Sequence, residues 1–211
     1  MQCHFRKVLF YVIVMTLFVV GCAEGVPVEE AVDPIADPEA EPVSKSEEEG
    51  KEDVIDIFDA VPSGDYETVQ DYIDDGEDVN AEGTLGSRPL HLAARGGHIE
   101  IAQLLIDNGA DVNIRSDPGF TPLHAAAHGN YPEMVELLLE HGAEINTQDD
   151  HGFTALHRAA VYGNTEASEV LLENGIDVNL LDKRDYTALG VALRGDFEET
   201  ADLIESYGGI E

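Results

Sequence analysis

Equivalent residues recur every 33 positions through the C-terminal part of this 211-residue chain. An asparagine that closes a polar turn recurs at Asn80, Asn113, Asn146 and Asn179, and a glycine and a leucine repeat at the same interval. A fixed period of this length is typical of folds in which one supersecondary unit is copied along an axis. Such folds present an extended surface to other molecules. The period therefore predicts a stacked-repeat protein that works by binding.

Each repeat unit contains the signals of two helices. Thr121 is a favourable N-cap and Pro122 suits the first helical position, so one helix begins there. Apolar residues at helical spacing between Met134 and Leu139 predict a second helix, which ends before Gly142. Between the helices we expect a turn with positive φ, because its position always holds glycine, asparagine or aspartate. These turn residues are Gly64, Gly97, Asn130, Gly163 and Asp196.

Two motifs within the unit resemble the signatures of the ankyrin-repeat family. Thr121 to Ala127 matches the Thr-Pro-Leu-His motif of the first helix, and Leu105 to Asn113 matches the Gly-Ala-Asp-Val-Asn motif that follows the second. The resemblance covers roughly residues 53–211 and implies an all-α repeat solenoid, in which a β-turn finger precedes two antiparallel helices. We expect an N-terminal cap, three standard repeats and a C-terminal cap repeat. Their expected bounds are about 53–80, 81–113, 114–146, 147–179 and 180–211.

The first 22 residues are of a different kind. Arg6 and Lys7 precede an apolar run over 8–20, which is too short to span a bilayer and fits the core of a signal peptide. The run ends in Val-Val-Gly-Cys, which resembles a bacterial lipobox, so we expect a lipoprotein signal peptide at 1–21 and lipidation of Cys22. The alternatives are an ordinary secretory signal cleaved just beyond, or a signal anchor. A lipid anchor implies export to the bacterial cell envelope, and to the outer membrane in a Gram-negative cell.

Residues 22–52 form the predicted link between this anchor and the repeats. They contain four prolines, no aromatic residue, and 11 acidic residues against 2 basic ones. Such a composition cannot bury enough apolar surface to fold, and its self-repulsion favours an extended chain. We therefore interpret the segment as an acidic, disordered tether.

The chain is strongly acidic, with 44 Asp and Glu residues against 11 Lys and Arg residues and a formal net charge of −33. This charge argues against nucleic acid or anionic lipid as the partner, because both would be repelled. It favours a basic protein partner, while a need for solubility explains the same charge equally well. We expect no small-molecule substrate and a monomeric protein.

The sequence contains little that points to catalysis or to a metal. His91, His124 and His157 occupy one position of the repeat, and helices of neighbouring repeats pack about 8–10 Å apart, so these histidines cannot share a zinc ion. The ankyrin resemblance implies a structural, hydrogen-bonding role for them. Acidic pairs such as Asp149-Asp150 are predicted to be solvated turns. Because no phosphate-binding glycine loop or nucleophile elbow is present, we expect no enzyme and no cofactor. We expect no metal either, because the repeat histidines cannot share an ion and no acidic cluster matches a calcium-binding loop.

The ankyrin resemblance also implies where a partner binds, namely at the finger tips and the exposed side of the first helices. Aromatic residues and arginines are frequent there, as they are in other protein interfaces. The candidate contact residues are Leu85, Ser87, Arg95, Pro118, Phe120, His128, His151, Phe153, Tyr162, Arg184, Tyr186 and Arg194. Phe120, Phe153 and Tyr186 have a second interpretation, because their rings could instead pack between neighbouring fingers.

These expectations combine into one function and one alternative. The first is a membrane-anchored, non-enzymatic module that presents its fingers and first helices to a protein partner. The alternative is an accessory factor of the envelope, immunity-like or stress-related, that inhibits or stabilises a specific enzyme or toxin.

Overall fold

The structure is a computed structural model that describes residues 56–211. The predicted signal peptide, Cys22 and the acidic tether lie outside the described residues. From 56 onward the chain forms five helix pairs, and the described part contains no strand, so the predicted all-α repeat solenoid is confirmed. The first helices of the pairs are α2 (Ile57–Ser63), α4 (Pro89–Gly96), α6 (Pro122–Gly129), α8 (Ala155–Tyr162) and α10 (Ala188–Arg194). The second helices are α3 (Tyr66–Asp74), α5 (Ile99–Asp107), α7 (Pro132–Glu140), α9 (Thr165–Glu173) and α11 (Glu198–Ser206).

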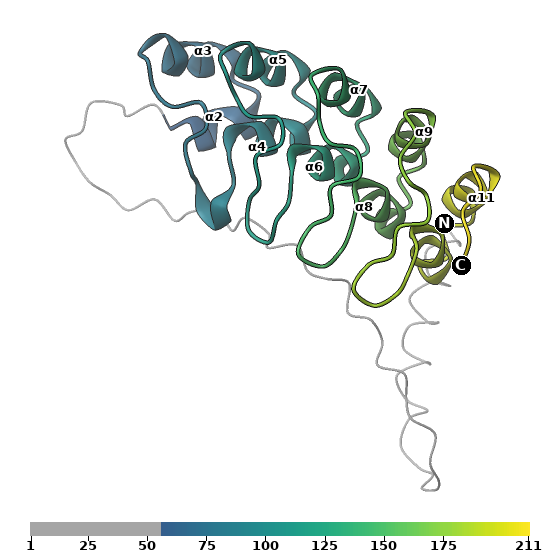
Figure 1. Ribbon diagram of the computed structural model, residues 1–211. Coiled ribbons are helices and arrows are strands. Elements are labelled where there is room, and N and C mark those ends of the chain that lie inside the picture. The colour runs from purple at the N-terminus through teal and green to yellow at the C-terminus, as the bar shows by residue number, and fades with distance from the viewer. Residues whose placement is uncertain (1–55) are drawn as a thin grey trace, which may run out of the picture. The chain divides into compact units, whose positions relative to one another are not determined.

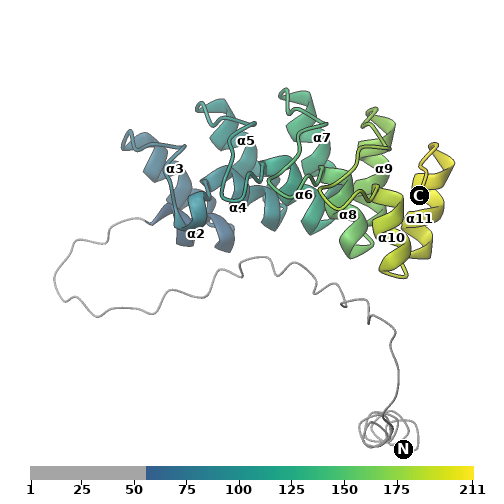
Figure 2. The ribbon, with the colours of Figure 1, turned by 60° about the horizontal axis from the view of Figure 1, so that its bottom comes forward.

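The helix pairs stack side by side in two rows. The first helices form one row and the second helices the other, and the loops that join successive pairs project as fingers beyond the first row (Figures 1 and 2). Each helix packs on its pair mate and on the equivalent helices of the adjacent repeats. A short 3-10 helix, η1 (Thr84–Gly86), forms the tip of the first finger. The stack therefore offers two chemically separate surfaces, one made by fingers and first helices and one by second helices.

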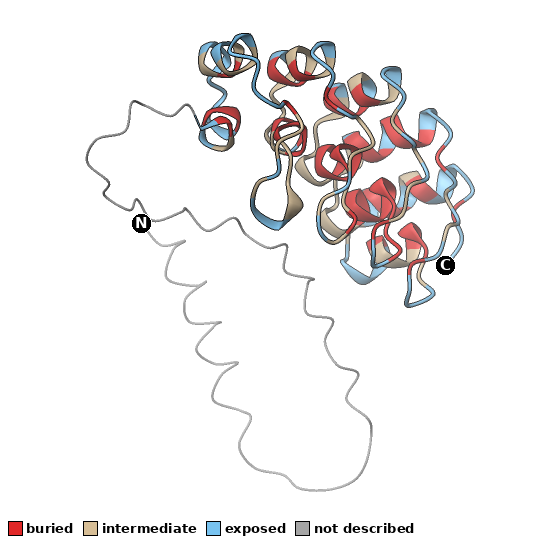
Figure 3. Cartoon of the chain, turned by 60° about the vertical axis from the view of Figure 1, so that its left-hand side comes forward, coloured by how far each residue is buried: buried red, intermediate tan, exposed pale blue. Residues whose placement is uncertain are grey.

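The core lies between the two rows, where the red segments of Figure 3 concentrate. Alanines such as Ala93, Ala126 and Ala159 are fully buried on the first helices, with large residues such as Leu105 and Leu138 beside them on the second. Small side chains let neighbouring helices approach closely, and the larger ones fill the space between rows. The first helices are thus buried on two sides.

The asparagine that closes each unit links it to the following repeat. The Asn113 side chain donates from Nδ2 to the carbonyl of Gly142 at 3.0 Å, and its Oδ1 accepts from the backbone N–H of Glu144 at 2.8 Å. Asn80, one repeat before Asn113, and Asn179, two repeats after it, make the same two hydrogen bonds to the repeat that follows each of them. These bonds satisfy backbone groups at the end of the next second helix, which explains why the asparagine keeps the 33-residue period.

Two features favour glycine at the turn between the two helices, namely its backbone conformation and the close approach of a side chain from the next repeat. The predicted positive φ is confirmed at all five turn positions, including 68° at Gly97 and 57° at Asn130. In addition, a Cβ on Gly97 would stand 2.5 Å from the ring of Tyr131 in the following repeat. Gly163 lies under the ring of Phe197 in the same way. The repeats therefore interlock through an aromatic ring that covers a glycine of the preceding unit.

A candidate protein-binding surface on the fingers and first helices

Each finger is a tight turn held by its own backbone and, in two cases, by a carboxylate. In the finger of the fourth repeat, Asp149 N–H donates to the carbonyl of Phe153 at 2.8 Å, which closes the turn. The Asp149 carboxylate accepts from the N–H groups of His151 and Phe153 at 2.7 and 2.9 Å. Asp182 holds the last finger in the same manner. Asp149 is consequently buried, so the prediction of a solvated turn at Asp149-Asp150 is wrong for Asp149 and fits only the exposed Asp150.

Neighbouring fingers are tied to one another by backbone hydrogen bonds. Three carbonyls just before the turn glycines each accept from an N–H group of the next finger, at 2.9 to 3.0 Å. The three bonds join Asp117 to Leu85, Asp150 to Pro118, and Lys183 to His151. Because the accepting residues are three of the predicted tip residues, their side chains are held in a row at a fixed spacing.

The repeat histidines fasten the first helices to the fingers. His124 accepts at Nδ1 from the Thr121 N–H at 3.2 Å, and its Nε2 lies 2.9 Å from the carbonyl of Phe153 in the next finger. His91 and His157 make equivalent contacts with the next fingers. Burial lowers the pKa of His91 and of His124 from 6.5 to about 4, against the opposing effect of the carbonyl. Neutral, fully engaged rings fit the predicted structural role.

No cluster of three metal-ligating side chains occurs among residues 56–211. His128, one of the predicted contact residues, packs against Tyr162 with ring centroids 4.4 Å apart and the planes nearly perpendicular. None of the helices in the described part of the chain is long and apolar enough to cross a bilayer.

The four predicted residues at the finger tips lie where a partner can reach them. His151 and Arg184 are exposed, Pro118 is half-buried, and Leu85 is 48% exposed. Leu85 also adopts φ 56° and ψ 33°, a left-handed conformation that costs a residue with a branched side chain about 1–2 kcal/mol. A large apolar side chain that is both exposed and conformationally strained marks this tip as a candidate contact.

The four predicted residues just after the turn are less accessible. Phe153 is only 5% exposed, and Ser87, Phe120 and Tyr186 are half-buried. The Phe153 ring stacks on His157 at a centroid distance of 5.5 Å, and the Phe120 ring tilts over His124 at 5.2 Å. Packing between fingers is therefore the role that the geometry gives Phe153, and a direct contact with a partner needs the ring to move.

Arg158 is not among the contact residues predicted from the sequence, yet its side chain contacts both of these rings. Its guanidinium carbon lies 4.6 Å from the ring centroid of Phe120 and 5.0 Å from that of Phe153, and Nη2 donates to the Asp149 carboxylate at 2.6 Å. Arg158 is only 2% exposed. It thereby joins two fingers and the helix α8. One sequence signal was available, because the same position holds Leu92, Ala125 and Val191 in other repeats.

At the ends of the first helices, the predicted residues divide into exposed cations and packed rings. Arg95 and Arg194 are exposed, whereas His128 and Tyr162 are half-buried against each other. Arg194 lies over the Tyr186 ring at 4.8 Å and donates to its hydroxyl at 3.0 Å. This contact joins the last finger, just after its turn, to the end of α10.

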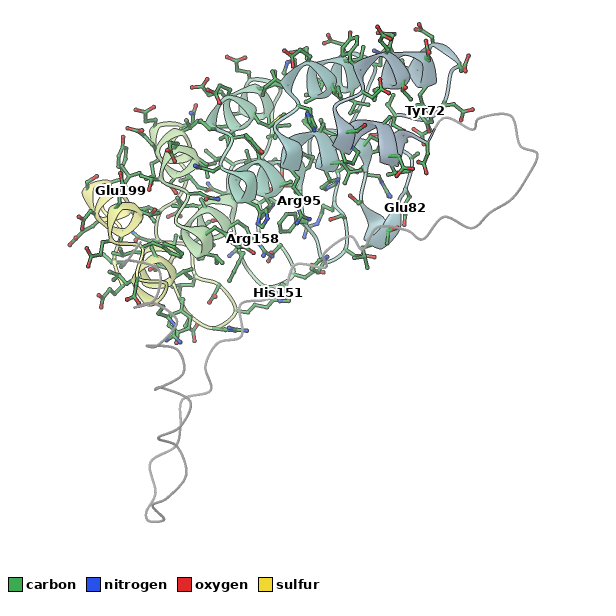
Figure 4. The ribbon with its side chains drawn as sticks, turned by 180° about the vertical axis from the view of Figure 1, so that it is seen from behind. Tyr72, Glu82, Arg95, His151, Arg158 and Glu199 are labelled. Atoms are coloured by element: carbon green, nitrogen blue, oxygen red, sulfur yellow. The ribbon has the colours of Figure 1, made fainter. Side chains whose placement is uncertain are left out.

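Charge separates the two surfaces of the stack. The five second helices contain 15 Asp and Glu residues and no Lys or Arg. All seven Lys and Arg residues of the described part lie in the fingers or first helices, namely Arg88, Arg95, Arg115, Arg158, Lys183, Arg184 and Arg194. In Figure 4, Arg95, Arg158 and His151 lie on the finger side, while Tyr72 and Glu199 belong to the second-helix row. Within the described part, the second helices therefore form a surface that contains carboxylates and no Lys or Arg.

Two family models match this geometry. A model of ankyrin repeats in three copies matches residues 57–149, and a model of ankyrin repeats in many copies matches residues 138–192. No curated protein matches the chain. The chain belongs to the ankyrin-repeat family, and its repeats constitute a protein–protein interaction module.

Proposed function

We propose that the chain is a non-enzymatic binding module that presents its fingers and first helices to a protein partner, from a lipid anchor at Cys22. The observation that carries the proposal is that every described Lys and Arg lies in the fingers or first helices, where all except the buried Arg158 are at least partly exposed. Exposed cations and aromatic rings on a rigid frame are the usual anchors of an interface. Interfinger hydrogen bonds hold them in place before a partner arrives, which reduces the entropy cost of association.

The charge separation refines what kind of partner this surface fits. Exposed cations such as Arg95, Arg184 and Arg194 alternate there with carboxylates such as Asp117 and Asp185. A surface of mixed sign favours a partner with a complementary mixed or acidic patch. The expectation of a basic partner rests on the net charge of −33 for the whole chain, to which the second helices contribute 15 negative charges and no positive one.

Affinity capture with the full-length chain tests the proposal. Capture from native envelope material should yield a protein whose binding is lost when Arg95 and Arg194 are replaced together by glutamate. The matched control is Glu136→Lys on α7, which alters the charge of the other surface and should leave capture unchanged. A partner that is lost with the control and retained with the arginine variant would contradict the proposal.

Leu85→Gly provides a second, more local test. Glycine adopts positive φ without the penalty that leucine carries, while losing more backbone entropy on folding, so stability should change by less than about 1 kcal/mol. Reduced capture by this variant would then report a lost contact at the finger tip. Unchanged capture would remove Leu85 from the interface.

The proposal of a lipid anchor rests only on the sequence Val19-Val20-Gly21-Cys22. Two or more acyl chains on a terminal cysteine bind a bilayer stably, whereas one chain binds only marginally. Mass spectrometry of the mature N-terminus should find an acylated Cys22. An unmodified start at Ala23 or beyond would rule the lipid anchor out without touching the binding proposal.

A further inference from the structure

An open groove lies on the second-helix surface, away from the fingers. It has a volume of about 730 Å³ and runs along α5, with the start of α3 as its other wall. The lining residues that matter for binding are Tyr66, Ile99, Glu100, Leu104 and Asp107. At a helical rise of 1.5 Å per residue, the stretch from Ile99 to Asp107 is about 12 Å long, which suits a few residues of a bound chain.

The groove combines apolar walls with carboxylates that form no ion pair with another described residue. Tyr66 is 43% exposed, and Ile99 and Leu104 are half-buried, so apolar side chains remain open to a ligand. Glu100 is exposed, and none of the described residues forms an ion pair with it. Asp107 accepts a hydrogen bond from the Gln103 amide at 2.8 Å and is otherwise exposed. No Lys or Arg is present on any of the described second helices, so a basic partner segment complements the charge of these carboxylates.

We propose that this groove docks a short basic segment of a partner protein, in which an apolar side chain is flanked by lysine or arginine. The apolar side chain would lie against Tyr66 and Leu104, and its cationic neighbours would meet Glu100 and Asp107. Desolvated apolar contact supplies affinity, and the opposite charges supply register and a fast, salt-sensitive encounter. The site is separate from the fingers and does not depend on the binding function proposed for them.

A general attraction of cations to an acidic protein is the competing explanation, so the probe must separate the two. The probe is an acetylated and amidated peptide of sequence Lys-Lys-Leu-Leu-Lys-Lys, titrated into the full-length chain labelled with nitrogen-15. A peptide with serine in place of leucine keeps the charge and removes the apolar contact. A third peptide with glutamate in place of lysine keeps the apolar contact and reverses the charge.

Specific docking should shift the backbone amides at the start of α3 and along α5, and only with the first peptide. Glu100→Lys should weaken that binding by about tenfold, equivalent to roughly 1.4 kcal/mol. Tyr66→Ser should weaken it as well, whereas Tyr207→Ser, at an equally exposed tyrosine of the last repeat, should have no effect. The matched charge control is Glu133→Lys, one repeat further on the same face of α7, which should leave binding unchanged.

Three results would overturn the proposal: equal binding of the serine peptide, amide shifts spread evenly over α7, α9 and α11, or an equal loss with Glu133→Lys. Each would mean that the acidic surface attracts cations without a docking site. The Arg95→Glu and Arg194→Glu changes that test the finger surface should not affect this peptide, so the two proposals can fail independently.

Discussion

The guanidinium of Arg158 and the carboxylate of Asp149 form a buried ion pair at 2.6 Å, and their side chains are 3% and 0% exposed. Burial by itself raises the pKa of Asp149, but the hydrogen bond from Arg158 and the N–H groups of Phe153 and His151 outweigh it and hold the pKa below its ordinary value. A buried pair of this kind is expensive to break, because the remaining charge is left without compensation. The pair joins the finger that contains Asp149 to the helix that follows it.

Asp149→Asn should therefore destabilise the protein by about 3 kcal/mol. Asparagine still accepts from the finger backbone but no longer compensates the buried Arg158 cation. Asp182→Asn is a matched control, since Asp182 accepts from the N–H groups of Arg184 and Tyr186 while Val191 stands at the arginine position. That control should lose less than about 1 kcal/mol. Urea unfolding followed by circular dichroism measures the loss of stability in both variants. Equal losses would show that the Asp149 carboxylate is not needed to compensate the buried Arg158 cation.

The finger phenylalanines provide a second prediction, which separates packing from partner contact. Phe153→Ala should lower the free energy of unfolding by about 3 kcal/mol, because the ring is buried between Arg158 and His157. Phe120→Ala should cost less, because Phe120 is only half-buried. Thermal unfolding of the two variants beside the wild type gives the comparison. A nearly unchanged melting temperature for Phe153→Ala would restore the interpretation of this ring as a contact residue.

The contact between Gly97 and Tyr131 yields a third prediction. Gly97→Ala adds a Cβ that meets the Tyr131 ring at 2.5 Å, and it also places alanine at φ 68°. Gly76→Ala is the control, because Gly76 has φ 80° and nothing within 4 Å of a Cβ. The control should cost about 1 kcal/mol for its backbone alone, and Gly97→Ala should cost at least about twice as much by adding the penalty of overpacking. Equal costs would mean that the ring moves aside freely.

The chain contains a natural solution to this clash, and copying it provides a rescue. In the next repeat, Asn130 takes the place of the glycine and Asn164 that of the ring. Asn164 Nδ2 donates to the carbonyls of Ala127 and His128 at 2.8 Å, and Asn130 Oδ1 accepts from the Ala167 N–H at 3.1 Å. The double change Gly97→Asn with Tyr131→Asn should therefore be less destabilising than Gly97→Asn alone. A double variant that loses the sum of the single effects would refute this pairing.

These pairings separate the features that can be predicted from the sequence from those that need the structure. The helix pairs, their caps and the positive φ at Gly97 follow from local preferences that recur with the period, so they could be predicted. The ring of Tyr131 over Gly97 joins residues 34 positions apart, and the local pattern contains no sign of that contact. Arg158 is an intermediate case. An arginine at a helix position that is otherwise apolar indicates burial, but its partners come from two different fingers and need the fold to be identified.

The 33-residue period is enough to predict how charge is distributed over the repeats. A net charge averages over both surfaces and so favoured a basic partner for the whole domain. Sorting the same residues by their position in the 33-residue unit places every Lys and Arg of the described part outside the second helices. The groove beside α5 could not be found in this way, because its shape depends on how α3 and α5 pack.

The buried histidines make stability depend on pH in a defined direction. The pKa of His91 and of His124 is about 4 in the folded protein against 6.5 for an ordinary histidine, chiefly because of burial. Well above pH 6.5 both rings are neutral in the folded and unfolded states, so they cause no change. Between pH 6.5 and 4 the unfolded chain binds protons that the folded protein does not, and the free energy of unfolding falls. At pH 5 the loss is on the order of 2 kcal/mol for each ring.

Urea unfolding at pH 7 and at pH 5 measures this dependence. His124→Gln should make the loss between the two pH values smaller, whatever it does to stability at pH 7, because one of the titrating rings is removed. His151→Gln is the matched control for the substitution itself, since it changes an exposed histidine at a finger tip. The lowered pKa of Asp149 acts only below its ordinary value of 3.8 and therefore does not contribute in this window. Equal stability at pH 7 and pH 5 would contradict the neutral, buried state of both rings.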